Sequence, residues 1–282
     1  MKRIILIKEK ISRILRNANA LIGLVLIAIV FFFAIFADWI APYDPVISYP
    51  SEALQPPTFR HFMGTDDLGR DIFSRVIYGA RISLGVSFTS TISAAIIGTI
   101  LGVIAGYFGK IVDITVSRFN EILFSIPDIL LALTIIAILG PGTDQLIVAL
   151  AIAYTPIFIR LTRSIALKSR ELPYVEAAKA IGEKEINIIL RCILPNCVTP
   201  VLVQGTLTFA YAILAEAAFS FLALGTQPPN PSWGRMLSDA RVFMLTAPWA
   251  AVFPGISIFF TSLAFNLFGD GLRDAFDVRL QT

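Results

Sequence analysis

The sequence predicts an all-α, polytopic membrane protein with six transmembrane helices. The first observation is composition: 56% of the 282 residues are hydrophobic and 15% are charged, with a mean hydropathy of +0.77. Such a chain is too apolar for an ordinary soluble domain. The second is a series of apolar runs of about 20 residues, the length that a helix needs to cross a bilayer core. The third is an uneven distribution of lysine and arginine between the two sides that these spans define.

The N-terminal segment, residues 1–20, combines lysines and arginines with isoleucines at helical spacing. This pattern is typical of an amphipathic helix on the cytoplasmic membrane surface. Residues 21–40 are apolar apart from Asp38 and close with no small-residue cleavage pattern. We therefore expect them to form a retained first transmembrane helix.

A polar segment at 41–83 is expected on the extracytoplasmic side. Thr65 or Asp66 can cap the helix that follows it. Opposite charges four residues apart predict helical ion pairs, Asp66 with Arg70 and Asp71 with Arg75. A substrate or metal role is the alternative for its acidic residues Asp66, Asp67 and Asp71.

Residues 84–282 are expected to form a five-helix core. Pro127 and Asp128 interrupt its second span, and a proline-rich link at 227–248 places Trp233 where it could lie among lipid headgroups. A polar tail begins at Asp270. The predicted spans run at about 84–107, 122–139, 146–159, 198–224 and 249–267.

Small residues recur every four positions in the first span of this core. A ridge of this kind lets two helix backbones approach closely, so it should face another helix and not lipid. The ridge consists of Ala94, Gly98, Gly102 and Gly106.

The most polar interruption of the core is the segment 171–195. Pro173 suits the first turn of a helix and Gly182 suits the position just past a helix end, so a short helix is predicted at 173–181. A second helix at about 183–194 should stop before Pro195, because the residue before a proline avoids the helical conformation.

Glu216 is the only acidic or basic residue of the span at 198–224. A charged carboxylate at that depth costs about 2.5 to 3.5 kcal/mol, so the side chain must face protein or water, or be protonated. Two roles stay open: hydrogen bonding to a neighbouring helix, and lining a translocation path. The small residues around it fit the first role: Ala212, Ala215, Ala217 and Ala218.

No cofactor or metal is expected in this chain. The Gly106–Lys110 stretch lacks the spacing of a phosphate loop, and Ile111 stands where Ser or Thr would hold magnesium. His61 has no second histidine or cysteine beside it. Cys192 and Cys197 are five residues apart, which fits neither a zinc spacing nor a convincing disulfide.

The charges also predict the topology. With both termini in the cytoplasm and six spans, 17 of the 23 lysines and arginines fall inside and 6 outside. The positive-inside rule supports this orientation and places the segment 171–195 in the cytoplasm.

Three motifs in order resemble one family. Glu176-Ala177-Ala178, then Gly182, then Leu194-Pro195 resembles the EAA loop of ATP-binding-cassette importer permeases, with Cys192 in place of a usual isoleucine. The N-terminal and C-terminal motifs resemble the C-type permease subunit of dipeptide, oligopeptide and nickel importers. They are APYDP with HFMGTDDLGRD, and QPPNPSWGRMLSDA with LAFNLFGDGLRDAFD.

The resemblance implies a permease in the inner (plasma) membrane that translocates peptides or nickel inward. It implies a second homologous permease, two ATPase subunits that bind the ATP, and an extracytoplasmic substrate-binding protein as partners; no nucleic acid is expected. The EAA loop would be the cytoplasmic coupling-helix loop on which an ATPase docks. No catalytic residue is implied, so the chain is not expected to be an enzyme. The docking residues carried over are Glu176, Ala177, Ala178, Gly182, Leu194 and Pro195.

Two alternatives remain at this point. A self-sufficient secondary transporter would use Glu216 and Asp128 as ion or proton carriers and would be indifferent to ATP. An inert membrane scaffold would tolerate substitution throughout the segment 171–195.

Overall fold

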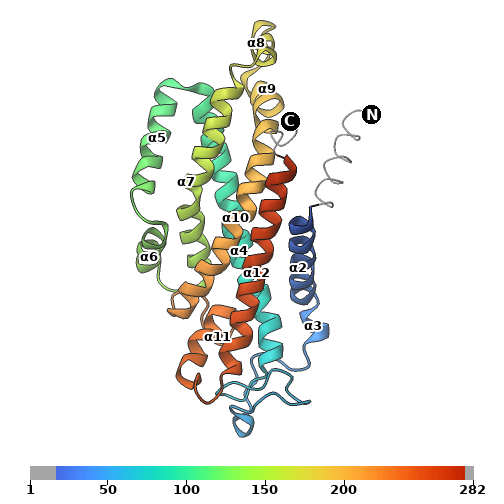
Figure 1. The fold of residues 1–282 in the computed structure, drawn as a ribbon. Helices are drawn as coiled ribbons and strands as arrows, with labels where there is room; N and C mark the ends of the chain where they lie inside the picture. Colours follow the sequence, from blue (N-terminus) through green and yellow to red (C-terminus); the bar gives the residue numbers. More distant parts are fainter. Residues whose placement is uncertain (1–16, 277–282) are drawn as a thin grey trace. The chain divides into compact units, whose positions relative to one another are not determined.

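A computed structural model describes residues 17–276, and every regular element in this range is helical apart from one isolated β-bridge (Figure 1). The first sixteen residues of the expected amphipathic segment lie outside the described range. In chain order the elements are α2 (Ala18–Ile35), α3 (Ala37–Ile40), η1 (Pro50–Glu52), α4 (Ile72–Phe108), α5 (Lys110–Phe124), α6 (Asp128–Leu139), α7 (Thr143–Ser169), α8 (Pro173–Ala180), α9 (Glu185–Ile188), the π-helical turn η2 (Ile189–Ile193), α10 (Leu194–Phe221), α11 (Trp233–Ala240), η3 (Arg241–Phe243) and α12 (Trp249–Phe276).

Five helical stretches of the described chain are long and apolar enough to cross a membrane. They are α2, α4, α7, α12 and the continuous stretch Glu185–Phe221. The pair α5 and α6 passes the same test together but is bent by 89° at its break. The expected all-helical membrane fold is therefore confirmed, with five or six candidate spans. Residues 110–121, expected as a polar link, instead belong to the helix α5.

Two compact units make up the described chain. Unit 1 takes residues 17–88, 136–147 and 209–276, and unit 2 takes 89–135 and 148–208. Each of the helices α4, α7 and α10 therefore contributes one part to each unit.

In unit 2 the glycine ridge of α4 packs directly on α7, as expected. A Cβ atom built on Gly98 would lie 2.5 Å from the Cβ of Phe158, and one on Gly102 would lie 2.1 Å from Thr162 Oγ1. At Gly106 the nearest atom, 2.6 Å away, is the carbonyl oxygen of Arg163. No side chain fits at these positions, so the glycines set the spacing of the two helices.

In unit 1, α2 lies beside α12, and a glycine from each helix takes part in the contact at the N-terminal end of α2 (Figure 1). A Cβ on Gly23 of α2 would lie 2.6 Å from the backbone nitrogen of Phe268, and one on Gly271 of α12 would lie 2.4 Å from the Cβ of Ala20. Close packing of this kind fixes the first transmembrane helix against its own chain.

The helix α4 begins twelve residues before the predicted span, at Ile72. Asp71 caps it, since its carboxylate accepts from the backbone N–H of Ser74 at 2.8 Å and from Ser74 Oγ at 2.7 Å. The predicted cap at Thr65 or Asp66 was wrong, because those residues belong to a turn-rich loop that ends at a bridge between Thr65 and Asp71.

The predicted break before Pro195 was also wrong. Helical structure continues from Glu185 to Phe221 through the π-helical turn η2. There the backbone N–H of Leu194 bonds to the carbonyl of Ile189, five residues back. A widened turn of this kind accommodates a proline that lacks the N–H for a regular helical bond.

The C-terminal part differs from expectation in two respects. The first residues of the expected polar tail, from Asp270 to Phe276, belong to α12, and residues 277–282 lie outside the described range. Trp233 is 2% exposed and its Nε1 donates to the Val76 carbonyl at 2.9 Å, so it packs in the core and is not a headgroup residue.

Candidate functional site

The helix α8 has the boundaries that its proline and glycine predict. Pro173 occupies its first turn, and Gly182 adopts a φ of +77° just past its end. The Gly182 N–H donates to the Lys179 carbonyl at 3.0 Å, and the Glu183 N–H donates to the Ala178 carbonyl at 3.1 Å. These two bonds form a Schellman motif, which ends the helix in one defined direction.

One face of α8 is buried in unit 2. Val175 and Ala178 belong to an apolar cluster that includes Tyr107 of α4 and Ile188 of α9. Ala178 was expected to admit a partner protein, but the structure places it against its own chain. The buried face therefore fixes the position of α8.

The other face of α8 is exposed. Glu176 and Ala177, both candidate docking residues, lie on it together with Lys179. Ile181, at the end of the helix, is 81% exposed, and Gly182 meets no atom within 4 Å of its Cβ position. The exposed face of α8 therefore presents small and charged side chains, with one apolar side chain at its end.

Polar contacts hold α8 against its neighbours. The Tyr107 hydroxyl hydrogen-bonds Glu185 of α9, and the Lys179 Nζ lies 5.0 Å from the centre of the Tyr107 ring. On the other side, Asn196 of α10 donates to the Tyr174 hydroxyl at 2.8 Å. The contacts connect α8 to α4 and α10, and they connect α4 to α9.

Leu194 and Pro195 close the segment in a different way from the other candidates. Leu194 is half-buried and packs against the cluster under α8, while Pro195 is exposed. Both lie inside the continuous helical stretch. The structure thus groups Glu176, Ala177 and Gly182 on an exposed surface and assigns Ala178 and Leu194 to its support.

Glu216 is fully buried in unit 1. Ser220 Oγ donates to its Oε1 at 2.7 Å, and the hydroxyls of Ser83 and Ser232 lie beside the same carboxyl. Its Oε2 makes no hydrogen bond of ordinary geometry with described residues. The carboxyl is therefore surrounded by hydroxyl groups and has no cationic partner among the described residues.

Each of these serines also accepts a backbone N–H from the segment that follows α10. Trp233 N–H donates to Ser83 Oγ at 3.2 Å. The other two bonds run from Thr226 to Ser220 at 3.1 Å and from Arg235 to Ser232 at 3.2 Å. Glu216 thereby connects α4 and α10 to the start of α11. This arrangement supports the hydrogen-bonding role that the sequence left open.

Asp128, the second candidate ion carrier, lies at the first position of α6. Its side chain is exposed, and its Oδ1 accepts from the backbone N–H of Ile129 at 2.9 Å. That is the behaviour of a helix N-terminal residue, which is stabilised by the helix dipole.

The loop between α3 and α4 is organised around Asp66. Its Oδ1 accepts from the backbone N–H groups of Leu68 and Arg70, both at 2.9 Å, and its Oδ2 pairs with Arg70 Nε at 2.7 Å. The predicted pair of Asp66 with Arg70 therefore forms, although the intervening residues are not helical. The predicted pair of Asp71 with Arg75 was wrong.

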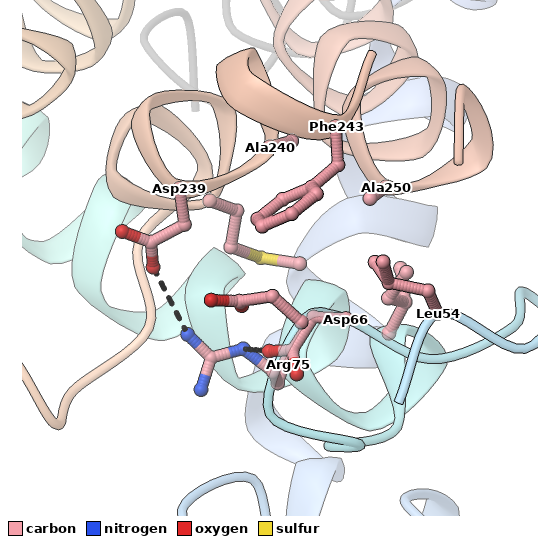
Figure 2. A pocket seen from close by; sticks show the side chains of 10 residues that line it. Leu54, Asp66, Arg75, Asp239, Ala240, Phe243 and Ala250 are labelled. Atoms are coloured by element: carbon pink, nitrogen blue, oxygen red, sulfur yellow. Dashed lines mark ion pairs between the residues drawn. The ribbon is translucent and has the colours of Figure 1, made fainter. Parts of the chain in front are cut away.

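Arg75 instead pairs with two other acids. Figure 2 shows its guanidinium between Asp66 and Asp239, at 3.4 Å and 3.9 Å. Asp239 comes from α11, so Arg75 connects the start of α4 and the loop before it to α11. Sequence reasoning did not single out Asp239, because it stands far from Arg75 along the chain.

His61 is buried between two carboxylates of the same loop. Its Nδ1 lies 2.9 Å from Asp71 and its Nε2 lies 3.2 Å from Glu52. Residues 17–276 contain no group of three or more His, Cys, Asp or Glu side chains placed to hold a metal ion. Asp71 acts there as a helix cap, and Asp66 and Glu52 act as ion-pair partners.

Comparison with known proteins places the fold in a family. Residues 98–282 match the model described as the binding-protein-dependent transport system inner membrane component. The chain belongs to this family. Residues 6–57 match a second model, the N-terminal TM domain of oligopeptide transport permease C. Membership makes the chain a non-catalytic, multi-pass membrane component of a transport system.

Curated relatives cover nearly the whole chain. The dipeptide transport system permease protein DppC of Alkalihalophilus pseudofirmus is 47% identical over 98% of this chain and 90% of its own length. The di/tripeptide transport system permease protein DppC of Pseudomonas aeruginosa is 41% identical over 98% and 93%. The glutathione transport system permease protein GsiD of Escherichia coli is 43% identical over 95% and 89%.

A solved structure shares the fold. A chain of the inward-facing MetNI methionine ABC transporter superposes with a TM-score of 0.57 at 20% identity, covering 73% of this chain and 98% of that chain. At this identity the likeness concerns the fold alone.

Proposed function

We propose that the chain is a C-type permease subunit of an ATP-binding-cassette importer that moves short peptides into the cell. It acts with a second homologous permease, two ATPase subunits and an extracytoplasmic substrate-binding protein. Peptides are favoured over nickel because the relatives above are named for dipeptides, di/tripeptides and glutathione. Both termini lie in the cytoplasm, as the charge distribution indicates.

The observation that carries the coupling role is the construction of α8. Its inner face is packed against α4 and α9, and its outer face carries Glu176 and Ala177 in the open. The Schellman turn at Gly182 fixes how the chain leaves this surface. An ATPase that docks there can move α8 as a rigid body, and closure of the two ATPases then switches the permease pair between inward-facing and outward-facing states.

Replacement of Gly182 by valine tests this proposal. A β-branched residue at a φ of +77° is strained, so the turn behind α8 should change direction. In proteoliposomes that contain the whole importer, Gly182→Val should uncouple ATP hydrolysis from dipeptide uptake while the subunit still assembles. The measurement is the number of peptides taken up per ATP hydrolysed.

Gly140→Val is the matched control. Gly140 has a φ of +88°, and no atom lies within 4 Å of the position that a Cβ would take there, but it lies in the turn between α6 and α7. It carries the same backbone strain away from the proposed docking surface, so coupling should survive. Normal coupling in Gly182→Val would refute the docking role.

The secondary-transporter alternative makes the opposite prediction. Under that alternative, an ion gradient should drive the chain alone to accumulate peptide. The double variant Glu216→Gln, Asp128→Asn, which lacks both candidate carriers, should then show no uptake. Strict dependence of uptake on the ATPase subunits and ATP excludes it.

A further inference from the structure

A hollow of about 490 Å³ lies beside α11 in unit 1. Its volume falls within the range of about 300–1,000 Å³ that is usual for small-molecule sites. We call it the α11 hollow, and its lining residues are Asp67, Phe221, Leu222, Ala223, Arg235, Ser238, Asp239, Arg241, Val242 and Phe243.

The charged residues of the α11 hollow are two acids and two bases. Asp67 and Asp239 are the acids, and Arg235 and Arg241 are the bases. A lone anion would meet the two carboxylates and a lone cation would meet the two guanidinium groups. The hollow is therefore suited to a ligand that carries both charges.

One wall of the hollow is fixed in position. Asp239 pairs with Arg235 at 2.8 Å and also forms longer ion pairs with Arg70 and Arg75, each at 3.9 Å. Figure 2 shows the Asp239 carboxylate directed toward Arg75. A carboxylate held by three cations provides a rigid base for the groups around it.

Other polar groups of the hollow retain unused capacity. The Nε of Arg235 is buried and donates to no described group. Arg241 is exposed and forms no ion pair with the described residues. Within residues 17–276, Asp67 has a single ion pair, the long contact with Arg70 at 3.9 Å, and burial together with the neighbouring Asp66 raises its pKa. Asp67 therefore gains from an additional cation, and the two arginines gain from an additional carboxylate.

The remaining walls are apolar. Phe221 is the last residue of α10, Leu222 and Ala223 directly follow it, and Val242 and Phe243 come from η3. Leu222 and Val242 are largely exposed. A short peptide combines an ammonium end, a carboxylate end and side chains that can cover such residues.

We propose that the α11 hollow binds a short zwitterionic peptide, with the peptide's amino end at Asp67 and its carboxylate at Arg241 and Arg235. The proposal rests on the proposed function, since it names where this permease would contact the peptide that it transports. The permease would then contribute to selection by peptide termini, beyond what its binding protein contributes.

The test compares three peptides in proteoliposomes that contain the complete importer. These are dialanine, its C-terminal amide and its N-acetyl form. A charge-assisted contact of this kind corresponds to roughly tenfold or more in affinity. Arg241→Ala should therefore raise the KM for dialanine and for the N-acetyl form about tenfold and leave the KM for the amide unchanged. Asp67→Asn should raise the KM for dialanine and for the amide and leave the KM for the N-acetyl form unchanged.

Arg60→Ala is the control for loss of one positive charge. Arg60 is exposed, lies in the same unit and pairs with Glu52 at 2.7 Å. The KM values of the Arg60→Ala complex should therefore match those of the wild type for all three peptides. Arg241→Lys keeps the charge and should retain the preference for a free carboxylate. If the capped peptides are not transported, binding of tritiated dialanine to the assembled complex in nanodiscs, with the caps as competitors, gives the same comparison.

The outcomes separate this proposal from the proposed function. If the wild-type complex shows no ATP-driven dipeptide uptake, the proposed function fails. If uptake is normal but Arg241→Ala and Asp67→Asn behave like Arg60→Ala, the proposal for the hollow is wrong and the function stands. An equal rise in KM for all three peptides, together with weaker stimulation of the ATPases by the loaded binding protein, also overturns the proposal for the hollow. The hollow would then bind that protein.

Discussion

At Glu216 a fully buried carboxyl is accommodated without a described cation. Three serines from three segments surround it, and each serine oxygen also accepts a backbone N–H. The Ser220 hydroxyl is thus oriented by the N–H bond that it accepts from Thr226, and it donates its own proton to Glu216. The residue connects α4 and α10 to the start of α11.

Substitution of Glu216 separates hydrogen bonding from a role in the translocation path. Glu216→Ala removes the acceptor for buried hydroxyls, which costs about 1 to 3 kcal/mol for a group left unsatisfied. It should lower the thermal unfolding temperature of the purified complex. Glu216→Gln keeps an oxygen acceptor and should preserve assembly and most of the dipeptide uptake.

Uptake assays on these variants decide between the two roles. Complete loss of transport in Glu216→Gln, with the complex assembled normally, would favour a path-lining carboxylate. Transport that follows the measured stability in both variants would favour hydrogen bonding.

At the scale of the elements, the contact between α4 and α7 depends on glycines that leave no room for a side chain. A Cβ on Gly102 would lie 2.5 Å from the carbonyl oxygen of Ile159 as well as 2.1 Å from Thr162 Oγ1. Gly85 stands in the same helix and meets nothing within 4 Å. The two positions form a matched pair within one helix.

Gly102→Ala should destabilise the subunit by about 1 to 3 kcal/mol, the usual cost of overpacking a tight contact. Gly85→Ala should be neutral or stabilising, because alanine is the better helix former by about 1 kcal/mol. Thermal unfolding of the detergent-solubilised complex measures both. Equal unfolding temperatures for the two variants would mean that the helices can separate at no cost.

The elements that local residues determine were predictable from sequence. Pro173 and Gly182 gave α8 to within one residue, because each acts on its own backbone. The spacing of glycines in α4 predicted a helix partner without naming α7. The early start of α4 was missed because Arg75, a charge that argues against a span, is neutralised by Asp239 from a distant segment.

The candidate site was predictable to a similar extent. The motif located the segment 171–195, but it could not tell that Ala178 faces inward while Ala177 faces outward. The rule that a helix ends before a proline failed at Pro195, because the π-helical turn before it lets the helix continue without the missing N–H. Ser232 directly precedes Trp233 at a helix start, which is a signal that could have identified it as an N-cap residue.

At the scale of the whole molecule, the proposed topology places the segment 171–195 and the loop before α12 on opposite sides of the membrane. Lys184 is exposed in the first, and Leu245 is fully exposed in the second. A single cysteine introduced at either position reports on which side of the membrane that position lies. The background chain lacks Cys192 and Cys197. Lys184→Cys should react with an impermeant maleimide only after the membrane is permeabilised, and Leu245→Cys should react in intact cells.

The reverse labelling pattern would invert the topology and place the proposed docking surface away from ATP. Labelling of both positions in intact cells would show that the chain does not cross the membrane as proposed. Uptake by the two labelled variants before reaction serves as the control for correct insertion.

The loop between α3 and α4 is held by Asp66, Asp71, His61 and Arg75 through hydrogen bonds and ion pairs. The chain has two cysteines, both free, and neither lies in this loop. Its structure therefore does not depend on the redox poise of its surroundings, since it has no thiol to oxidise and no bridge for a reductant to break. The subunit can be synthesised and purified in reducing buffer with this loop intact.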